Sequence, residues 1–365
     1  MNRSAGVGHG SVDVVVVGGG AAGLSAAKIL ARSRRSVVVV DAGTARNAPA
    51  EGVHNYLYAE GTAPSRLAKI GRAEARAYGV EVVEGVATAG AVLGQPDPGG
   101  PRFSVRLRTG DGADRTVEAR RVVLATGLVD VLPDVAGLAP RWGRDVLHCP
   151  FCHGWEVRDQ AVGVLGTTPM ALHQVMLFRQ LTDDLVYFQH TAPDPTDDQV
   201  EQLTALGIEW VVGEVAAVLT SEDALTGVRM SDGRIVPRRA LAVATGLEAR
   251  QDLLADLGLT TTDLEVGGVV VGHHLPADPA GLTATPGVWA AGNLSAPMAQ
   301  VITAAAAGAG VGAAVHLDLI GEDTQLAVTA LRARRASGGR DSFPAAMEAE
   351  NGERVLGNRR HGLTL

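Results

Sequence analysis

Residues 12–41, VDVVVVGGGAAGLSAAKILARSRRSVVVVD, decide the fold class of this chain. The run 12–17 is nearly all valine, as expected of a parallel strand that is buried on both faces. The glycine turn at 18–23 leads into apolar residues at helical spacing, and a second valine-rich strand ends at Asp41. A strand, glycine turn, helix and strand with an acid at its tip, all within about 30 residues, predict a dinucleotide-binding βαβ unit.

Each glycine of this turn has an expected task. Gly18 permits the tight turn, Gly20 lets the backbone approach a pyrophosphate, and Gly23 lets the helix pack close to the strand. The amides and the positive dipole end at the helix N-terminus face the phosphates. Asp41 is placed to accept hydrogen bonds from the adenosine ribose hydroxyls. The alternative is a glycine turn without a ligand.

Length, charge and cysteine content exclude several classes of protein. The 365 residues suggest two domains. A net charge of −8 argues against nucleic-acid binding, and two cysteines exclude a disulfide-stapled secreted scaffold. The first ten residues lack a secretory apolar run, and the Ala/Gly-rich stretch 299–315 is too weakly apolar for a convincing membrane span. We expect a cytoplasmic protein without a membrane partner, in which 299–315 packs closely against another backbone or a ligand.

The strand and glycine-turn pattern recurs in weaker form. Residues 161–166, AVGVLG, predict a second strand and turn, followed by a helix at 169–181 and a strand at 185–188. Ala-Thr-Gly follows apolar runs at 125–127 and again at 244–246. This repetition predicts a duplicated nucleotide-binding domain.

Both cysteines lie in HCPFCHGWE, residues 148–156. The spacing of Cys149 and Cys152 allows a small disulfide ring that opens and closes easily, which favours redox catalysis over a structural disulfide. No metal site is predicted, because His148 and His153 are adjacent to the cysteines and adjacent residues rarely ligate together. A c-type haem attachment motif is formally present but requires export. A thioredoxin-like module would not begin with a dinucleotide-binding unit, so a dithiol that works on a flavin is favoured.

The ordered motifs resemble a known family. The glycine turn at 18–23, Ala-Thr-Gly before Cys-x-x-Cys, the second glycine turn and AAGN at 290–293 resemble the low-molecular-weight thioredoxin reductases. These are FAD-dependent pyridine nucleotide–disulfide oxidoreductases, and the resemblance covers about residues 12–320. Within the class, HCPFCHGWE is similar to the thioredoxin-reductase-like dithiol oxidases that close disulfides in natural products such as gliotoxin and holomycin.

This resemblance implies an α/β fold of two nested Rossmann-like dinucleotide-binding domains, and a homodimer. Residues 1–137 and 252–320 would form the FAD-binding domain. Residues 138–251 would form an inserted NAD(P)-binding-like domain that carries the cysteines. Residues 321–365 mix charges of both signs, and we expect a mobile tail there.

The resemblance also implies the FAD contacts. These are Gly18, Gly20, Ala22 and Gly23 at the pyrophosphate, Asp41, Arg46 and Asn47 at and beyond the ribose, Ala125, Thr126 and Gly127 along the nucleotide, and Gly292, Asn293, Gln300 and Val301 toward the flavin. The family usually has Asp in place of Asn293 and Arg in place of Ala299, and we expect FAD binding to survive both changes. For AAGN, close helix packing is the alternative role.

The second glycine turn departs from an NADPH site. Its matching residues are Gly166, Thr168 and Ala171, so a threonine side chain occupies space that the pyrophosphate would use. The following strand leads into QHTAPDP, which has Asp194 and no arginine for a 2′-phosphate. Loss of such a cation costs about 1.5–3 kcal/mol, which makes NADPH a doubtful cofactor.

The favoured function is an FAD-dependent dithiol oxidase with a small-molecule dithiol substrate and oxygen as acceptor. By analogy Cys149 exchanges with substrate, Cys152 faces the flavin, and His148 or His153 is the acid–base, with a solvated histidine as the alternative for each. One rival is an NADPH-dependent thioredoxin reductase acting on a thioredoxin-like protein. Another is a non-catalytic flavin-binding redox sensor.

Overall fold

The structure is a computed structural model that describes residues 11–94 and 97–337. The described residues up to Leu317 form one compact unit, and those from Asp318 onward belong to a second. Two parallel sheets dominate the first unit, and the two have the same strand order.

The first sheet contains the predicted βαβ unit. Its strands are β1 (Val12–Val17), β2 (Val37–Asp41), β3 (Glu81–Val92), β4 (Phe103–Thr109), β5 (Asp114–Leu124) and β18 (Val288–Ala290). The parallel strands run in the order β3-β2-β1-β5-β18, and β4 joins β3 to β5 by antiparallel pairing. Val14, Val15 and Val16 of β1 are completely buried, which confirms that this strand is covered on both faces.

The second sheet repeats this arrangement. Its strands are β7 (Val146–Leu147), β8 (Val162–Leu165), β9 (Leu185–Phe188), β10 (Glu209–Val211) and β14 (Ala240–Val243), all parallel in the order β10-β9-β8-β14-β7. The matching order confirms the predicted duplication. All five strands fall within 138–251, the range that the resemblance implies for the inserted domain.

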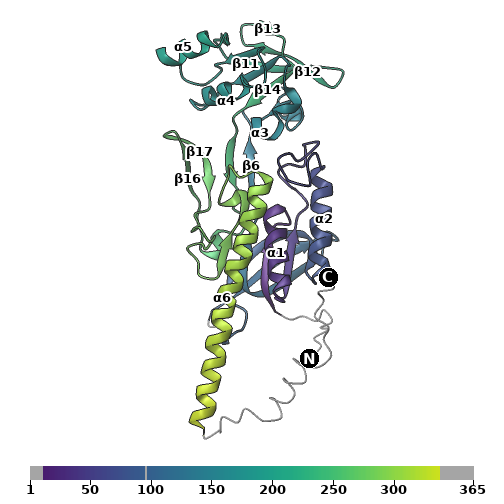
Figure 1. Cartoon of the computed structure of the whole chain (residues 1–365), viewed down its shortest axis with the longest axis vertical. Helices are drawn as coiled ribbons and strands as arrows, with labels where there is room; N and C mark the ends of the chain where they lie inside the picture. The colour runs from purple at the N-terminus through teal and green to yellow at the C-terminus, as the bar shows by residue number, and fades with distance from the viewer. Residues whose placement is uncertain (1–10, 95–96, 338–365) are drawn as a thin grey trace, which may run out of the picture. The chain divides into compact units, whose positions relative to one another are not determined.

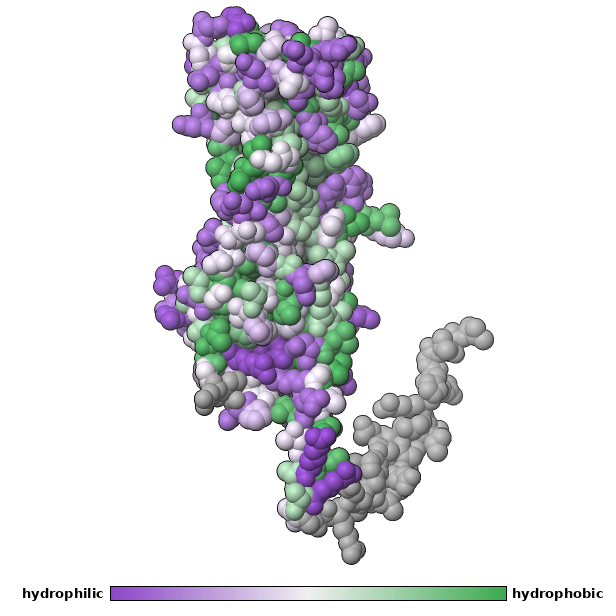
Figure 2. Space-filling model, turned by 90° about the vertical axis from the view of Figure 1, so that its left-hand side faces the viewer, coloured by the Kyte–Doolittle hydropathy of each residue, from purple (hydrophilic) through white to green (hydrophobic). Residues whose placement is uncertain are grey.

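Helices cover these sheets. They are α1 (Ala21–Arg32), α2 (Pro64–Ala77), α4 (Ala171–Phe178) and α5 (Asp197–Ala205). In Figure 1, α1 and α2 lie beside the first sheet, and α4 and α5 lie with the second. On the face shown in Figure 2, apolar and polar residues are interspersed, as on an ordinary protein surface.

Two smaller sheets complete the first unit. One is antiparallel and contains β11 (Val215–Ser221), β12 (Ala224–Met230) and β13 (Ile235–Val236). The other contains β6 (Leu128–Val131), β15 (Gly246–Ala249), β16 (Thr262–Val266) and β17 (Val269–His274). The chain enters the second parallel sheet after β6 and leaves it before β15, and these two strands pair antiparallel. Short helical turns are α3 (Pro150–His153), η1 (Ala139–Arg141), η2 (Trp155–Val157), η3 (Ala255–Leu257) and η4 (Gly292–Leu294).

The last helix, α6 (Val301–Ala336), explains the small residues of 299–315. A Cβ added to Gly308 would lie 2.0 Å from the carbonyl oxygen of Ala22, and one added to Gly312 would lie 2.8 Å from that of Ala26. The prediction of close packing against another backbone is therefore confirmed, with α1 as the partner. By length and composition α6 could also cross a membrane, but core helices of folded proteins pass the same test.

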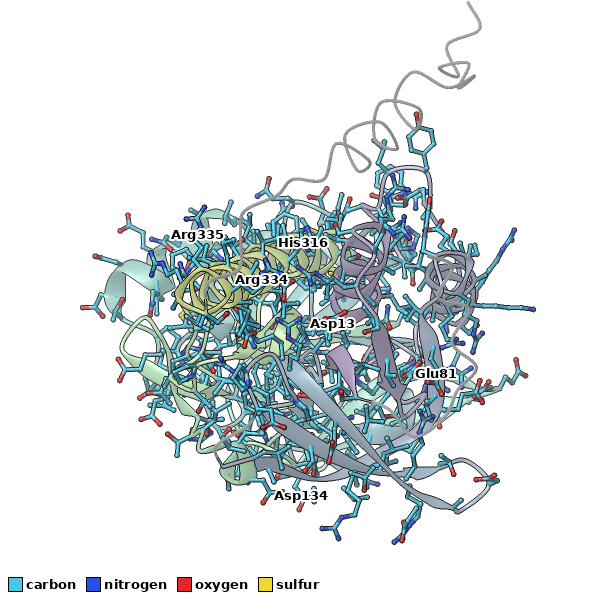
Figure 3. All side chains as sticks on the ribbon, turned by 90° about the horizontal axis from the view of Figure 1, so that it is seen from below. Asp13, Glu81, Asp134, His316, Arg334 and Arg335 are labelled. Atoms are coloured by element: carbon cyan, nitrogen blue, oxygen red, sulfur yellow. The ribbon has the colours of Figure 1, made fainter. Side chains whose placement is uncertain are left out.

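Polar contacts also tie α6 to the first sheet. Arg35 Nε donates to Nδ1 of His316 at 3.2 Å, and Arg35 Nη1 lies 3.8 Å from Oδ1 of Asp13. Figure 3 labels Asp13, which belongs to β1, and His316, which belongs to α6.

Residues 321–336, where the sequence analysis expects a mobile tail, continue α6 as regular helix. The helix does not end near 320, because its alanine, leucine and arginine residues are good helix formers even without an apolar stripe. Residues 338–365 lie outside the described part of the chain.

Candidate active site

The first glycine turn is packed against its surroundings as its spacing predicts. Gly18 has φ +109°, and an added Cβ would lie 2.2 Å from the Ala125 carbonyl oxygen. A Cβ on Gly23 would lie 1.9 Å from the Gly18 carbonyl oxygen, whereas one on Gly20 would meet no protein atom within 4 Å. The sequence analysis missed Gly19, where a Cβ would lie 2.4 Å from the Asp41 carboxyl carbon. The turn is therefore closely packed at three glycines and open to a ligand at Gly20.

A cavity of about 980 Å³ extends from this turn to the cysteine pair. All of the predicted site residues except Gly23 line it: Gly18, Gly20, Ala22, Asp41, Arg46, Asn47, Ala125, Thr126, Gly127, His148, Cys149, Cys152, His153, Gly292, Asn293, Gln300 and Val301. The hydroxyl oxygen of Thr126 is buried without a hydrogen-bond partner. The structure thus brings together residues from both parallel sheets and from the start of α6.

At the tip of β2, Asp41 has an ion-pair partner that the sequence did not reveal. Arg72 Nη1 on α2 lies 2.9 Å from Oδ2 of Asp41, and the Gly43 amide donates to Oδ1 at 3.0 Å. Arg72 also lines the cavity. No local pattern marks this arginine, because its role depends on where α2 packs.

The side chain of Asn293 holds the loop that precedes α6. Its amide nitrogen donates to the carbonyl oxygens of Ala296, Pro297 and Ala299 at 3.2, 3.0 and 2.8 Å. A carboxylate has no proton for these contacts. This donor role accounts for asparagine at a position where the resemblance leads us to expect aspartate.

The two cysteines differ in acidity. Both are free thiols and half-buried, with Cys149 immediately before α3 and Cys152 within it. The hydrogen bond with the Cys152 thiol lowers the pKa of Cys149 to about 7; burial opposes this shift, and nearby backbone amides and the charge of Arg46 support it. The same hydrogen bond, burial and the charge on Cys149 raise the pKa of Cys152. The sulfur that ionises first is that of Cys149, to which the resemblance assigns exchange with substrate.

Each flanking histidine is shifted toward its neutral form. Burial lowers the pKa of His148, whose Nδ1 lies 3.1 Å from the Val243 carbonyl oxygen. Burial likewise lowers the pKa of His153, which also hydrogen-bonds the Gly52 backbone. Nε2 of His153 is buried without a partner. Both imidazoles can therefore accept a proton.

A loop between residues 53 and 62 contacts the cysteine segment, which the sequence analysis did not foresee. Asn55 Nδ2 donates to the Phe151 carbonyl oxygen at 2.5 Å. The ring of His54 lies edge-on to that of His153 with centroids 6.2 Å apart, and its Nδ1 is 2.6 Å from Oε1 of Glu60. This loop has no periodic pattern from which its position could be read.

Arg46 forms a forked ion pair with Asp130 on β6. Its Nε and Nη2 each donate to one carboxylate oxygen at 2.7 Å, and the Thr245 hydroxyl donates to the same carboxylate at 2.8 Å. Burial raises the pKa of Asp130, but the hydrogen bonds and charge of Arg46 and the Thr245 contact leave it below its usual value. The sequence analysis assigned Arg46 to FAD; within the protein its guanidinium is directed to Asp130.

At the second glycine turn, Gly166 is packed against its surroundings much as Gly18 is at the first. A Cβ on Gly166 would lie 2.6 Å from the Gln189 carbonyl oxygen and 2.8 Å from the Tyr187 hydroxyl. The amide of Ala192 donates to the Gly166 carbonyl at 3.1 Å, and Gln189 Nε2 donates to Asp194 at 2.6 Å. The segment that would meet a 2′-phosphate therefore presents a carboxylate.

Comparisons with known proteins agree with this architecture. Residues 12–308 match the family described as pyridine nucleotide-disulphide oxidoreductase. Thioredoxin reductase sirT of Leptosphaeria maculans is 29% identical over 326 residues, which cover 85% of this chain and 95% of that protein. A probable thioredoxin reductase of Arthroderma benhamiae is 32% identical over 186 residues, 51% of this chain and 45% of that protein, so the match spans less than half of that relative.

Two solved structures are similar over most of the chain. HlmI is 39% identical with a TM-score of 0.79, and the match covers 92% of this chain and 99% of HlmI. An oxidoreductase from Agrobacterium tumefaciens is 30% identical with a TM-score of 0.75, covering 85% of this chain and 99% of that one.

Proposed function

Because the chain belongs to the pyridine nucleotide–disulphide oxidoreductase family and is an FAD-dependent disulfide oxidoreductase, we propose that it is a dithiol oxidase. It would close a disulfide in a small-molecule dithiol, with oxygen as the final acceptor. The observation that carries the proposal is the cavity that joins a nucleotide cradle to the cysteine pair, while the second glycine turn carries Thr168 in place of its middle glycine.

The residues present fit FAD. The cavity volume of about 980 Å³ suits a large cofactor. The open side of Gly20 and the uncapped N-terminus of α1 offer amides to a pyrophosphate, and the unpartnered hydroxyl of Thr126 is available to a ligand. When bound, FAD would take the two electrons and two protons of the reduced cysteine pair and pass them to oxygen, giving hydrogen peroxide.

The cysteines divide the exchange chemistry between them. A substrate thiol, losing its proton to His148 or His153, attacks the Cys149 sulfur of the disulfide; the Cys149–Cys152 bond breaks and Cys152 takes up a proton. The second substrate thiol then attacks the substrate sulfur of the mixed disulfide; the sulfur–sulfur bond to Cys149 breaks, and the released Cys149 takes up the proton of that thiol. A thiol with a low pKa is the better leaving group, so a pKa of about 7 at Cys149 favours this second step.

The rim of the cavity favours a small apolar substrate. Leu57, Tyr58 and Met298 line it and are largely exposed, at 77%, 101% and 64%. Exposed apolar side chains on the lining of the cavity that contains the cysteines offer a contact surface to an uncharged ring or alkyl group. NADPH is disfavoured, because Asp194 in the segment after β9 would repel a 2′-phosphate.

Oxygen consumption by the purified flavoprotein tests the proposal. We expect uptake with small dithiols that does not require NADPH, and its loss in Cys149→Ser and Cys152→Ser. Under anaerobic conditions dithiothreitol should bleach the flavin and NADPH should not. Rapid bleaching by NADPH would instead identify a thioredoxin reductase, and flavin that no dithiol can bleach would identify a non-catalytic flavoprotein.

A further inference from the structure

We propose that Arg46, clamped by Asp130, is a fixed positive charge that stabilises the thiolate of the cysteine pair during disulfide exchange. This assignment deepens the proposed function at the same site. Arg46 acts through the sulfur of Cys149, so it is a positioning residue for the exchange reaction.

The guanidinium has little freedom to move. Both oxygens of Asp130 hold it at 2.7 Å, and Nη1 lies 3.4 Å from the Pro297 carbonyl oxygen. The Asp130 side chain is only 6% exposed and is held in turn by Thr245 at 2.8 Å. A planar fork with contacts to β6 and to the loop before α6 keeps its charge in one place.

The ion pair lies beside the segment that leads into the cysteines. The Thr245 hydroxyl donates to Asp130, and the carbonyl oxygen of Val243, two residues earlier, lies 3.1 Å from Nδ1 of His148, the neighbour of Cys149. Arg46, Asp130, His148 and both cysteines line the same cavity. The thiol–thiol hydrogen bond and burial have the largest effects on the pKa of each cysteine, and the charge of Arg46 acts on both toward a lower pKa. Burial has the largest effect on the pKa of His148 and lowers it; Arg46 adds to this lowering and Asp130 opposes it.

Other titratable groups also face the cysteine segment. They are His148 and His153 beside the cysteines, Glu156 on η2, and His54 and Glu60 on the 53–62 loop. His54 lies between the two glutamates, at 2.6 Å from Glu60 and 3.5 Å from Glu156. Burial raises the pKa of Cys149, and the charge of the guanidinium, which persists at any pH at which the enzyme is folded, acts in the opposite direction.

The test is the pH dependence of Cys149 alkylation in the reduced, FAD-loaded protein. Iodoacetamide labelling at Cys149 is followed anaerobically by peptide mass spectrometry. Arg46→Gln removes the positive charge and should move the midpoint up by about half a pH unit, slowing labelling about threefold below the midpoint. Asp130→Asn keeps the shape but removes the opposing charge, and it should move the midpoint down by a similar amount.

Two further variants serve as controls. Arg46→Lys keeps the charge and should follow the wild-type profile more closely than Arg46→Gln. Arg158→Gln removes an arginine near the same segment that is stacked on exposed Trp155, 4.1 Å from its ring centroid, and should leave the midpoint unchanged.

Opposite shifts in Arg46→Gln and Asp130→Asn support the proposal, since a general loosening of the site would move both the same way. Shifts in one direction, or no shift in variants that retain FAD, overturn it. If Arg46→Gln does not retain FAD, Asp130→Asn decides alone, because an upward or absent shift there is equally fatal. Alkylation needs neither oxygen nor a particular dithiol, so this result stands apart from that of the oxygen-uptake test.

Discussion

Alanine at Gly23 should damage the fold of the nucleotide cradle, whereas alanine at Gly20 should damage only its affinity for FAD. At Gly23 the added Cβ would lie 1.9 Å from a backbone oxygen, so α1 has to move by more than 1 Å to reach an ordinary contact distance. At Gly20 the added Cβ would meet no protein atom within 4 Å. The pair therefore separates packing from ligand contact within one turn.

The magnitudes follow from these distances. Overlap with backbone that cannot rotate away costs about 3 kcal/mol, and the better helix propensity of alanine returns about 1 kcal/mol, so Gly23→Ala should lose about 2 kcal/mol of unfolding free energy. At about 2–4 °C per kcal/mol, the melting temperature should fall by about 4–8 °C. Gly20→Ala should leave the melting temperature of the FAD-free protein unchanged.

The assay is thermal unfolding of the FAD-free proteins by circular dichroism, together with FAD titration by flavin fluorescence. We expect Gly20→Ala to bind FAD at least about tenfold more weakly, which corresponds to about 1.4 kcal/mol. A Gly23→Ala protein that melts like wild type would falsify the packing argument. A Gly20→Ala protein with wild-type FAD affinity would show that the pyrophosphate does not approach this backbone.

Two other predictions concern side chains near the cysteines. Cys152→Ala removes the thiol hydrogen bond that does most to lower the pKa of Cys149, so the alkylation midpoint should rise from about 7 toward the ordinary thiol value, while Cys152→Ser retains a donor and should shift it less. The depressed pKa of Cys149 also makes the stability of the reduced protein depend on pH. The Cys149 thiolate stabilises the folded protein at high pH, and this stabilisation is lost as the pH falls through about 7. Asn293→Asp replaces a donor to three carbonyl oxygens by a carboxylate and should lower the free energy of unfolding by about 1–3 kcal/mol. We expect a lower melting temperature and faster amide exchange around residues 296–299. An unchanged exchange pattern would contradict the donor role.

Local patterns in the sequence predicted much of the framework. Valine runs, glycine turns and helical spacing each act over a few neighbouring residues, so the strands at 12–17 and 185–188 are where the pattern predicts them. The same holds for the task of Gly23, which depends on a helix crossing its own preceding turn. The sequence analysis did not foresee the helix at 321–336, because it relied on an apolar stripe, whereas a run of good helix formers continues α6 without one.

By itself, the sequence determined that this chain folds as two related βαβ units and carries one redox-type cysteine pair, because these features are encoded by neighbours along the chain. The tertiary structure alone decided which distant groups meet those cysteines. Arg46 pairs with Asp130 across 84 positions, and Asn55 reaches Phe151 across 96. Such contacts have no sequence spacing of their own, since they exist only when strands, loops and helices from separate parts of the chain pack around one cavity.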